Sequence, residues 1–278
     1  MDIEKAIVNI DNGLETISRE LITRNINCSK QDNLSFLENP DSVWGHSLHW
    51  HQWGIITHSR MSLKFYQELP QFLDDTNLTR KINKDLRKKI NNTDKGQLLP
   101  IAYLYHDLGK FVTRTKVQKA DGTFSFTFTN HEEASKDVIK SPLVLNNLKI
   151  LGFTDTQIEY ISNCAGLHYE LGKLRDTLLK NEKYTETDIS STELKTQLCE
   201  LMIKNIDYSL EIGLMFLIDS LAKQEIHMKN VNDIDRSISE IKRYLRGKSL
   251  SLKLIDAIYE FPNNYALAIK YLEIWKNT

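Results

Sequence analysis

The segment His106-Asp107-Leu108-Gly109-Lys110 carries the strongest chemical signal in the sequence. An imidazole nitrogen and a carboxylate oxygen at a helix end can converge on one ion, and this donor pair suits Zn, Mn, Fe or Ni better than Ca. Gly109 lets the backbone turn away, and Lys110 adds a cation that an intervening phosphate would make tolerable beside a metal. The alternative is an exposed helix end at which the lysine complements the helix dipole.

Asp219 is a second candidate, because the predicted helix around it, 214–222, is apolar almost all round. An ionised carboxylate in such a setting is costly unless it is paired or binds a metal. An ion pair with Lys223, one turn further on, is the alternative to a metal ligand.

Three histidines occupy distinctive positions: His58 in an apolar helix, His131 directly after a predicted hairpin, and His168 at the end of a helix. Each taken alone is explained equally well as a core or helix-end histidine. Together with His106 and the two aspartates they follow one order along the chain, namely His58, His106-Asp107, His131, His168 and Asp219.

In this order the chain resembles the HD superfamily of metal-dependent phosphohydrolases, and most closely the HD domain of bacterial tRNA nucleotidyltransferases and related RNA-end-processing enzymes. That pattern is an "HDxGK" segment, a β-hairpin with an Asp-Gly turn, a helix that starts "HEE", and a helix that ends on a further His. Here these parts are 106–110, 112–129, His131-Glu132-Glu133 and His168. The resemblance covers about residues 44–225 and does not extend to a nucleotidyltransferase domain.

The resemblance implies one divalent metal ion with the ligands His58, His106, Asp107 and Asp219. His131 and His168 would either hold a second ion that Asp107 bridges, or contact the phosphate and shuttle a proton. The catalytic residues would be Asp107, Lys110, His131 and His168. The cations that would bind substrate phosphate are Lys110, Lys223, Lys173 and Arg175.

The implied function is hydrolysis of a nucleotide-type phosphomonoester or phosphodiester, such as a cyclic nucleotide or an RNA terminus, by water that Mn, Ni, Fe, Co, Zn or Mg activates. Two branches of the superfamily do not fit the sequence. The guanosine-tetraphosphate hydrolases carry two acids shortly after the His-Asp pair, where this chain has Gly109-Lys110. The dNTP triphosphohydrolases carry further histidines just after that pair, which Phe111-Val112-Thr113 does not match. The competing hypothesis is a non-catalytic HD module that binds a nucleotide or nucleic acid for regulation.

Helical periodicity dominates the chain, with apolar residues three and four apart over 3–24. We predict further helices at 44–69, 98–108, 131–140, 155–167, 193–207, 210–228, 233–245, 251–260 and 263–276. Capping boxes at Asn130 and Thr154 would begin two of these helices. The polar segment 172–192 is predicted to be a loop or lid. The one β signal is a hairpin at about 112–129. The predicted fold is therefore an all-α, HD-like helical bundle with one inserted hairpin. We expect a single domain over 1–278, in which residues 1–43 and helices 230–278 pack on a core at 44–225.

Charge and composition limit the remaining possibilities. The 36 Lys and Arg against 37 Asp and Glu leave a net charge of −1, so the whole chain is no basic nucleic-acid binder. A basic stripe at Arg80, Lys81, Lys84, Arg87 and Lys88 is either a solvated face or a phosphate-binding one. The charged N-terminus and the lack of a long apolar run predict a cytoplasmic protein without a membrane segment. The oligomeric state stays open.

Overall fold

The computed structural model describes residues 2–42, 54–71, 73, 75–120, 122–180, 192–223 and 261–278. Within this part the chain is mainly helical, with two small antiparallel strand pairs, which confirms the predicted all-α class with a small β-hairpin. The pair at residues 89–94 was not predicted, and the HD-like arrangement of the bundle stays a prediction. The predicted helices at 233–245 and 251–260, and the first part of the helix predicted at 44–69, lie outside the described residues.

Backbone contacts divide the chain into two compact units. The first comprises residues 1–64 and 88–166, and the second comprises residues 65–87 and 167–278. Each unit is described by itself below. The single domain expected from the sequence stays a prediction.

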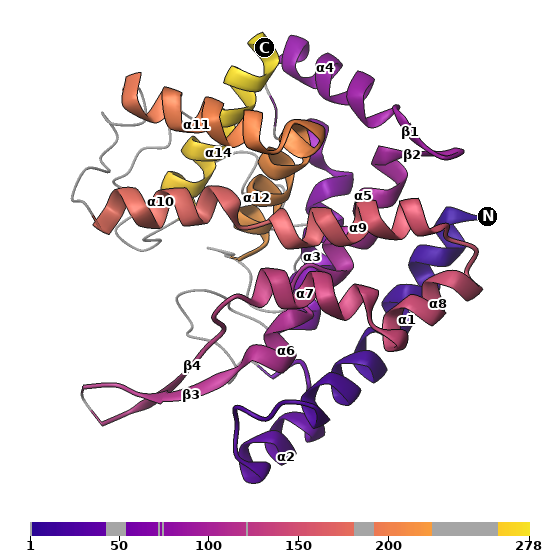
Figure 1. Cartoon of the computed structure of the whole chain (residues 1–278), viewed down its shortest axis with the longest axis vertical. Coiled ribbons are helices and arrows are strands. Elements are labelled where there is room, and N and C mark those ends of the chain that lie inside the picture. The colour runs from indigo at the N-terminus through magenta and orange to yellow at the C-terminus, as the bar shows by residue number, and fades with distance from the viewer. Residues whose placement is uncertain are drawn as a thin grey trace. The chain divides into compact units, whose positions relative to one another are not determined.

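The first unit is built on these elements: α1 (Ile3–Thr23), α2 (Lys30–Glu38), most of α3 (Ile55–Gln67), β1 (Lys89–Ile90), β2 (Thr93–Asp94), α5 (Lys95–Tyr105), α6 (Gly109–Thr113), β3 (Thr115–Gln118), β4 (Phe124–Thr127), α7 (His131–Lys140), α8 (Pro142–Ile150) and most of α9 (Asp155–Leu167). Helix α5 is apolar on all sides, and every residue from Leu98 to Tyr105 is buried. Helices α1 and α6 pack on one another, as do α6 and α7 (Figure 1). A helix buried on every side gives a rigid support for the residues that follow it.

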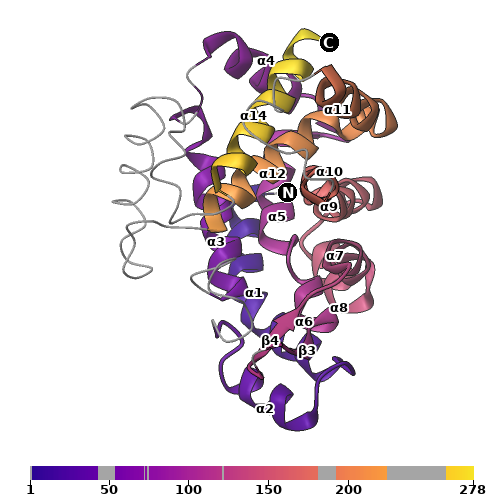
Figure 2. The same ribbon diagram turned by 90° about the vertical axis from the view of Figure 1, so that its left-hand side faces the viewer.

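The hairpin β3–β4 has the register Thr115 to Thr127 through Gln118 to Phe124. Gly122 adopts a positive φ of 81°, as a tight turn requires. The hairpin extends from α6 beside α2 in both views (Figures 1 and 2), where Phe126 packs edge-on against Phe36 with ring centroids 5.3 Å apart. The hairpin begins later than predicted, because the chain remains helical through Thr113 at the end of α6.

Three local predictions are corrected or confirmed by this unit. The helix predicted to stop at Gly109 already ends at Tyr105, and Gly109 begins α6 instead. The predicted capping box at Asn130 is wrong: Asn130 adopts a left-handed conformation with φ of 56° and its side chain makes no cap. The box at Thr154 is confirmed, because its N–H donates to the Gln157 side chain at 3.0 Å and its hydroxyl accepts from the Gln157 N–H at 3.4 Å.

The second unit contains η2 (Leu69–Gln71), α4 (Thr76–Leu86), α10 (Glu170–Lys180), α11 (Thr192–Lys204), η4 (Ile206–Tyr208), α12 (Ser209–Lys223) and α14 (Phe261–Asn277). Every residue of α12 is buried, and this helix packs against α10, α11 and α14. The close approach of α14 requires Gly213, since a Cβ there would lie 2.7 Å from the Leu272 side chain.

The loop predicted at 172–192 is wrong for residues 172–180, which belong to α10. The inward face of this helix includes Leu171 and Arg175, both at most 1% exposed. Because an arginine occupies a core position, the segment has the polar composition of a loop. Thr192, the last residue of the predicted loop, begins α11, and 181–191 lies outside the described residues. No helix in the described ranges is both long and apolar enough to cross a membrane.

Candidate metal centre

The centre of the first unit is a pair of buried imidazoles. His58 lies on α3 and His106 at the C-terminal end of α5, and both are 0% exposed. Their Nε2 atoms are 3.1 Å apart. Two nitrogens that share a tetrahedral ion at about 2.0–2.1 Å are separated by little more than 3 Å.

Backbone carbonyls orient two of the histidines in this unit. His106 Nδ1 lies 2.7 Å from the Tyr103 carbonyl oxygen, and His131 Nδ1 lies 2.9 Å from that of Phe128. Because a carbonyl oxygen only accepts, each of these Nδ1 atoms carries a proton, so Nε2 is the nitrogen left to bind a metal. This is the arrangement by which metal-binding histidines are held in place.

Asp107 lies between these rings and is 1% exposed. Its Oδ2 is 3.4 Å from His58 Nε2 and 3.5 Å from His106 Nε2, while its Oδ1 is 3.4 Å from His131 Nε2. The ligand atoms of His58, His106 and Asp107 all lie within 4.8 Å of one another. This cluster, which we call the His–Asp cluster (His58, His106, Asp107 and His131), therefore has the donor set and the spacing of a site that can hold a metal ion.

Lys110 contributes a buried positive charge to the same place. Its Nζ lies 2.6 Å from Asp107 Oδ2, and its side chain is 7% exposed. Burial acts to raise the pKa of the Asp107 carboxyl, but Lys110 and the three imidazoles hold that pKa well below its usual range. Asp107 is therefore a carboxylate at neutral pH, which is the form that binds metals.

His131 is also held in the form that a metal needs. Burial and the Lys110 ammonium lower the pKa of His131 to about 4, against the opposing effect of Asp107 and Glu132. The ring is neutral at pH 7 and offers its Nε2 lone pair toward Asp107.

A close helix contact sets the distance between Asp107 and His131. The Gly109 N–H donates to Ser135 Oγ at 2.8 Å, and Ser135 Oγ donates to the His131 carbonyl at 2.9 Å. A Cβ at Gly109 would lie 2.0 Å from the His131 carbonyl oxygen. Gly109 thus serves the close approach of α6 and α7, in addition to the change of direction predicted from the sequence.

The second unit holds the other predicted acid. Asp219 is 1% exposed on α12, and its Oδ2 lies 2.7 Å from Lys223 Nζ, one turn further on. Burial acts to lower the pKa of Lys223, but Asp219 and Tyr169 outweigh it and raise that pKa above its usual value. The ion pair considered at the sequence level is therefore present.

Arg175, predicted to bind substrate, is 1% exposed and lies within a network of side chains. It donates to the Tyr169 hydroxyl at 2.7 Å and to Asp176 Oδ1 at 2.6 Å, and it also bonds the Asn264 side chain of α14. Tyr169 in turn lies beneath Lys223, with Nζ 5.2 Å from the ring centroid. The sequence does not predict Tyr169 and Asn264 as members of this network, because a turn residue before α10 and a residue of α14 share no periodic signal.

The remaining predicted residues differ in exposure. His168 follows α9 directly, is 1% exposed, and has its ring centroid 6.3 Å from that of Tyr169. Lys173 is exposed on α10 and pairs with Glu170 at 2.8 Å. Its role in binding substrate stays a prediction.

A scan of protein-family models and a search of curated proteins find no match to this sequence. The resemblance to HD phosphohydrolases therefore stays a prediction from the motifs of the sequence.

Proposed function

We propose that this protein is a metal-dependent phosphohydrolase that cleaves a nucleotide-type phosphomonoester or phosphodiester. The observation that carries this function is the His–Asp cluster. Two imidazole nitrogens 3.1 Å apart and a buried carboxylate 3.4–3.5 Å from both form a compact donor set. A divalent ion bound there would supply Lewis acidity that activates water and polarises the phosphoryl group.

Following the order of these residues in the sequence, we propose Asp219 as a further ligand of this ion, beside His58, His106 and Asp107. We propose His168 as a partner of Asp107 and His131 on the same basis. Support comes from the order of these residues along the chain and from their chemistry. Five of the six, all but His131, are buried. A first ion would thus have two nitrogen and two carboxylate donors, which Zn, Mn, Fe, Co and Ni accept.

The protein's own residues supply orientation and charge. The Tyr103 and Phe128 carbonyls fix the rings of His106 and His131, so that both present Nε2 toward Asp107. Lys110 holds one Asp107 oxygen at 2.6 Å and leaves the other toward His131. In the proposed complex Lys110 would also balance the charge of a substrate phosphate.

The test is metal analysis of the purified protein combined with a substrate panel. Apo protein would be loaded in turn with Mn, Ni, Co, Zn and Mg, and assayed with a chromogenic phosphodiester, 2′,3′-cyclic nucleotides and nucleoside monophosphates. We expect one or two ions per chain and metal-dependent release of product. Absence of both bound metal and turnover across the panel would contradict the function. Bound metal and tight nucleotide binding without product would favour the regulatory module instead.

A further inference from the structure

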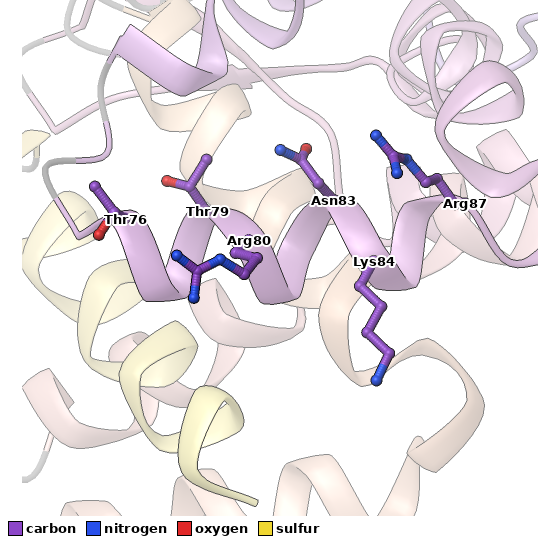
Figure 3. A pocket seen from close by; sticks show the side chains of 6 residues that line it. All are labelled: Thr76, Thr79, Arg80, Asn83, Lys84 and Arg87. Carbon is purple, nitrogen blue, oxygen red and sulfur yellow. The ribbon is translucent and has the colours of Figure 1, made fainter.

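Helix α4 presents a cationic face that the proposed phosphohydrolase chemistry does not use. Leu78, Ile82 and Leu86 form its buried stripe. The opposite side carries a pocket lined, among the described residues, by Thr76, Thr79, Arg80, Asn83, Lys84 and Arg87 (Figure 3). We call these six residues the α4 face.

The basic stripe predicted from the sequence divides into two parts in the structure. Lys81 points to the end of α14, where its Nζ donates to the carbonyls of Trp275 at 2.7 Å and Lys276 at 2.9 Å. It therefore stabilises a helix C-terminus. Arg80, Lys84 and Arg87 are exposed. In Figure 3 Arg87 and Lys84 point to opposite sides of the ribbon, and Arg80 lies across its front.

The exposed cations have few local partners. Arg80 bonds the Asn77 side chain at 3.3 Å, and neither Lys84 nor Arg87 pairs with a carboxylate among the residues that the structure describes. The α4 face contains three cations, two hydroxyls and one amide, and no acid. Its cations recur every three or four residues, about 4.5–6 Å apart along the helix axis.

From this composition we infer that the α4 face binds the phosphate backbone of a nucleic acid. Arg, Lys, Thr and Asn are the side chains that contact phosphate oxygens. The face has no aromatic residue to stack on a base, so the contact would be independent of sequence. This binding surface goes beyond the proposed hydrolysis and does not depend on it.

Other anionic partners fit the face less well. A helix that lies on a membrane inserts its apolar side, whereas the apolar side of α4 is buried in the protein. A protein partner would need an apolar interface core, and none of the six residues supplies one.

Fluorescence anisotropy with labelled 20-nucleotide RNA and DNA strands, in the presence of EDTA, tests this surface. We expect the triple variant Arg80→Gln, Lys84→Gln, Arg87→Gln to bind at least about tenfold more weakly than the wild type. The slope of log Kd against log salt should fall by about 2, or 0.7 for each of three lost phosphate contacts. The matched control is Lys30→Gln, Lys195→Gln, Lys204→Gln, which removes three exposed charges elsewhere and should bind as the wild type does.

Several results would overturn the inference. Equal affinities of the triple variant and the wild type would do so, as would no binding of either strand by the wild type at 50 mM salt. Equal loss of affinity in the triple and control variants would show that net charge alone is responsible. Equally tight binding of polyglutamate or anionic vesicles to the α4 face would identify a different partner. A loss specific to RNA or to DNA supports the inference and identifies the strand. Because EDTA removes divalent ions, failure of the hydrolase proposal leaves this experiment valid.

Discussion

The two units each bury an aspartate beside a lysine, yet the surroundings of the two pairs differ. Asp107 and Lys110 are 2.6 Å apart, and Asp219 and Lys223 are 2.7 Å apart. Around Asp107 the first unit places three imidazole rings, two of them oriented by backbone carbonyls. Around Lys223 the second unit places the Tyr169 ring, which Arg175 holds in turn.

This difference shows what a buried ion pair does and does not indicate. A buried acid with a lysine one turn away is satisfied electrostatically, so its burial alone is no sign of a metal. Imidazole rings around the same carboxylate are the additional feature, and the first unit places three of them around Asp107. The following predictions test how far the two aspartates differ.

The largest effect is expected from Asp107→Asn. The amide keeps the shape but loses the charge that both a metal and Lys110 need, so we expect activity to fall by about 10³-fold or more, or about 4 kcal/mol. Metal content measured by mass spectrometry should fall with it, while circular dichroism remains that of the wild type.

Asp219→Asn is the matched variant in the second unit. If Asp219 is a ligand as proposed, metal affinity should fall more than about 10-fold, the lower limit for disturbing residues around a metal. Unchanged metal content together with a lower melting temperature would instead show that Asp219 serves only as the ion-pair partner of Lys223.

Removal of either lysine should destabilise its unit, because a buried carboxylate is left without its counter-charge. For Lys110→Met and Lys223→Met we expect a loss of about 3 kcal/mol in the free energy of unfolding, measured in urea. Bound metal would replace the missing positive charge beside Asp107, so added Zn should restore more stability to Lys110→Met than to the apo wild type. If added Zn raises the free energy of unfolding of neither Lys110→Met nor Lys223→Met, a metal at Asp107 is contradicted.

Gly109→Ala should disturb the His–Asp cluster through the backbone. Its Cβ would lie 2.0 Å from the His131 carbonyl, so α6 and α7 must separate, at a cost of about 1–3 kcal/mol. Gly13→Ala is the control within α1, where the nearest atom lies 4.0 Å away. That change should stabilise the helix by about 0.5–1 kcal/mol. Equal effects of the two substitutions in thermal denaturation would refute the close-packing role of Gly109.

The smallest effect concerns an ion pair outside both aspartate sites. Lys116 Nζ of the hairpin lies 2.8 Å from Asp32 Oδ1 of α2, and this bond, together with Ser29, lowers the pKa of Asp32. Since the folded-state pKa lies below the unfolded value, the stabilisation is complete above the unfolded pKa and is lost as pH falls through the folded one. Lys116→Gln should therefore cost at most about 1 kcal/mol at pH 7 and nothing at strongly acidic pH. A cost that does not change with pH would show that the pair contributes through packing alone.

Local patterns were sufficient to predict much of the architecture. The periodicity of 3–24, the apolar run of 98–105 and the Thr154 capping box determine helices through neighbours at most four residues apart, and the structure confirms them. The failures have equally specific causes. The segment 172–180 has a polar composition because Arg175 takes a core position, and Asn130 adopts a left-handed conformation that its helix-cap pattern does not reveal.

The sequence by itself determined the fold class, the candidate ligands and the basic stripe on α4. Only the tertiary structure decided that His58 and His106 face each other and that Lys110 pairs with Asp107. It also decided that Arg175 belongs to a buried hydrogen-bond network. On α4 it decided that Lys81 caps α14, while Arg80, Lys84 and Arg87 stay exposed. The physical reason is range. Helix formation and capping depend on residues within one or two turns, whereas a donor set joins side chains 48 positions apart, and their approach depends on how the helices between them pack.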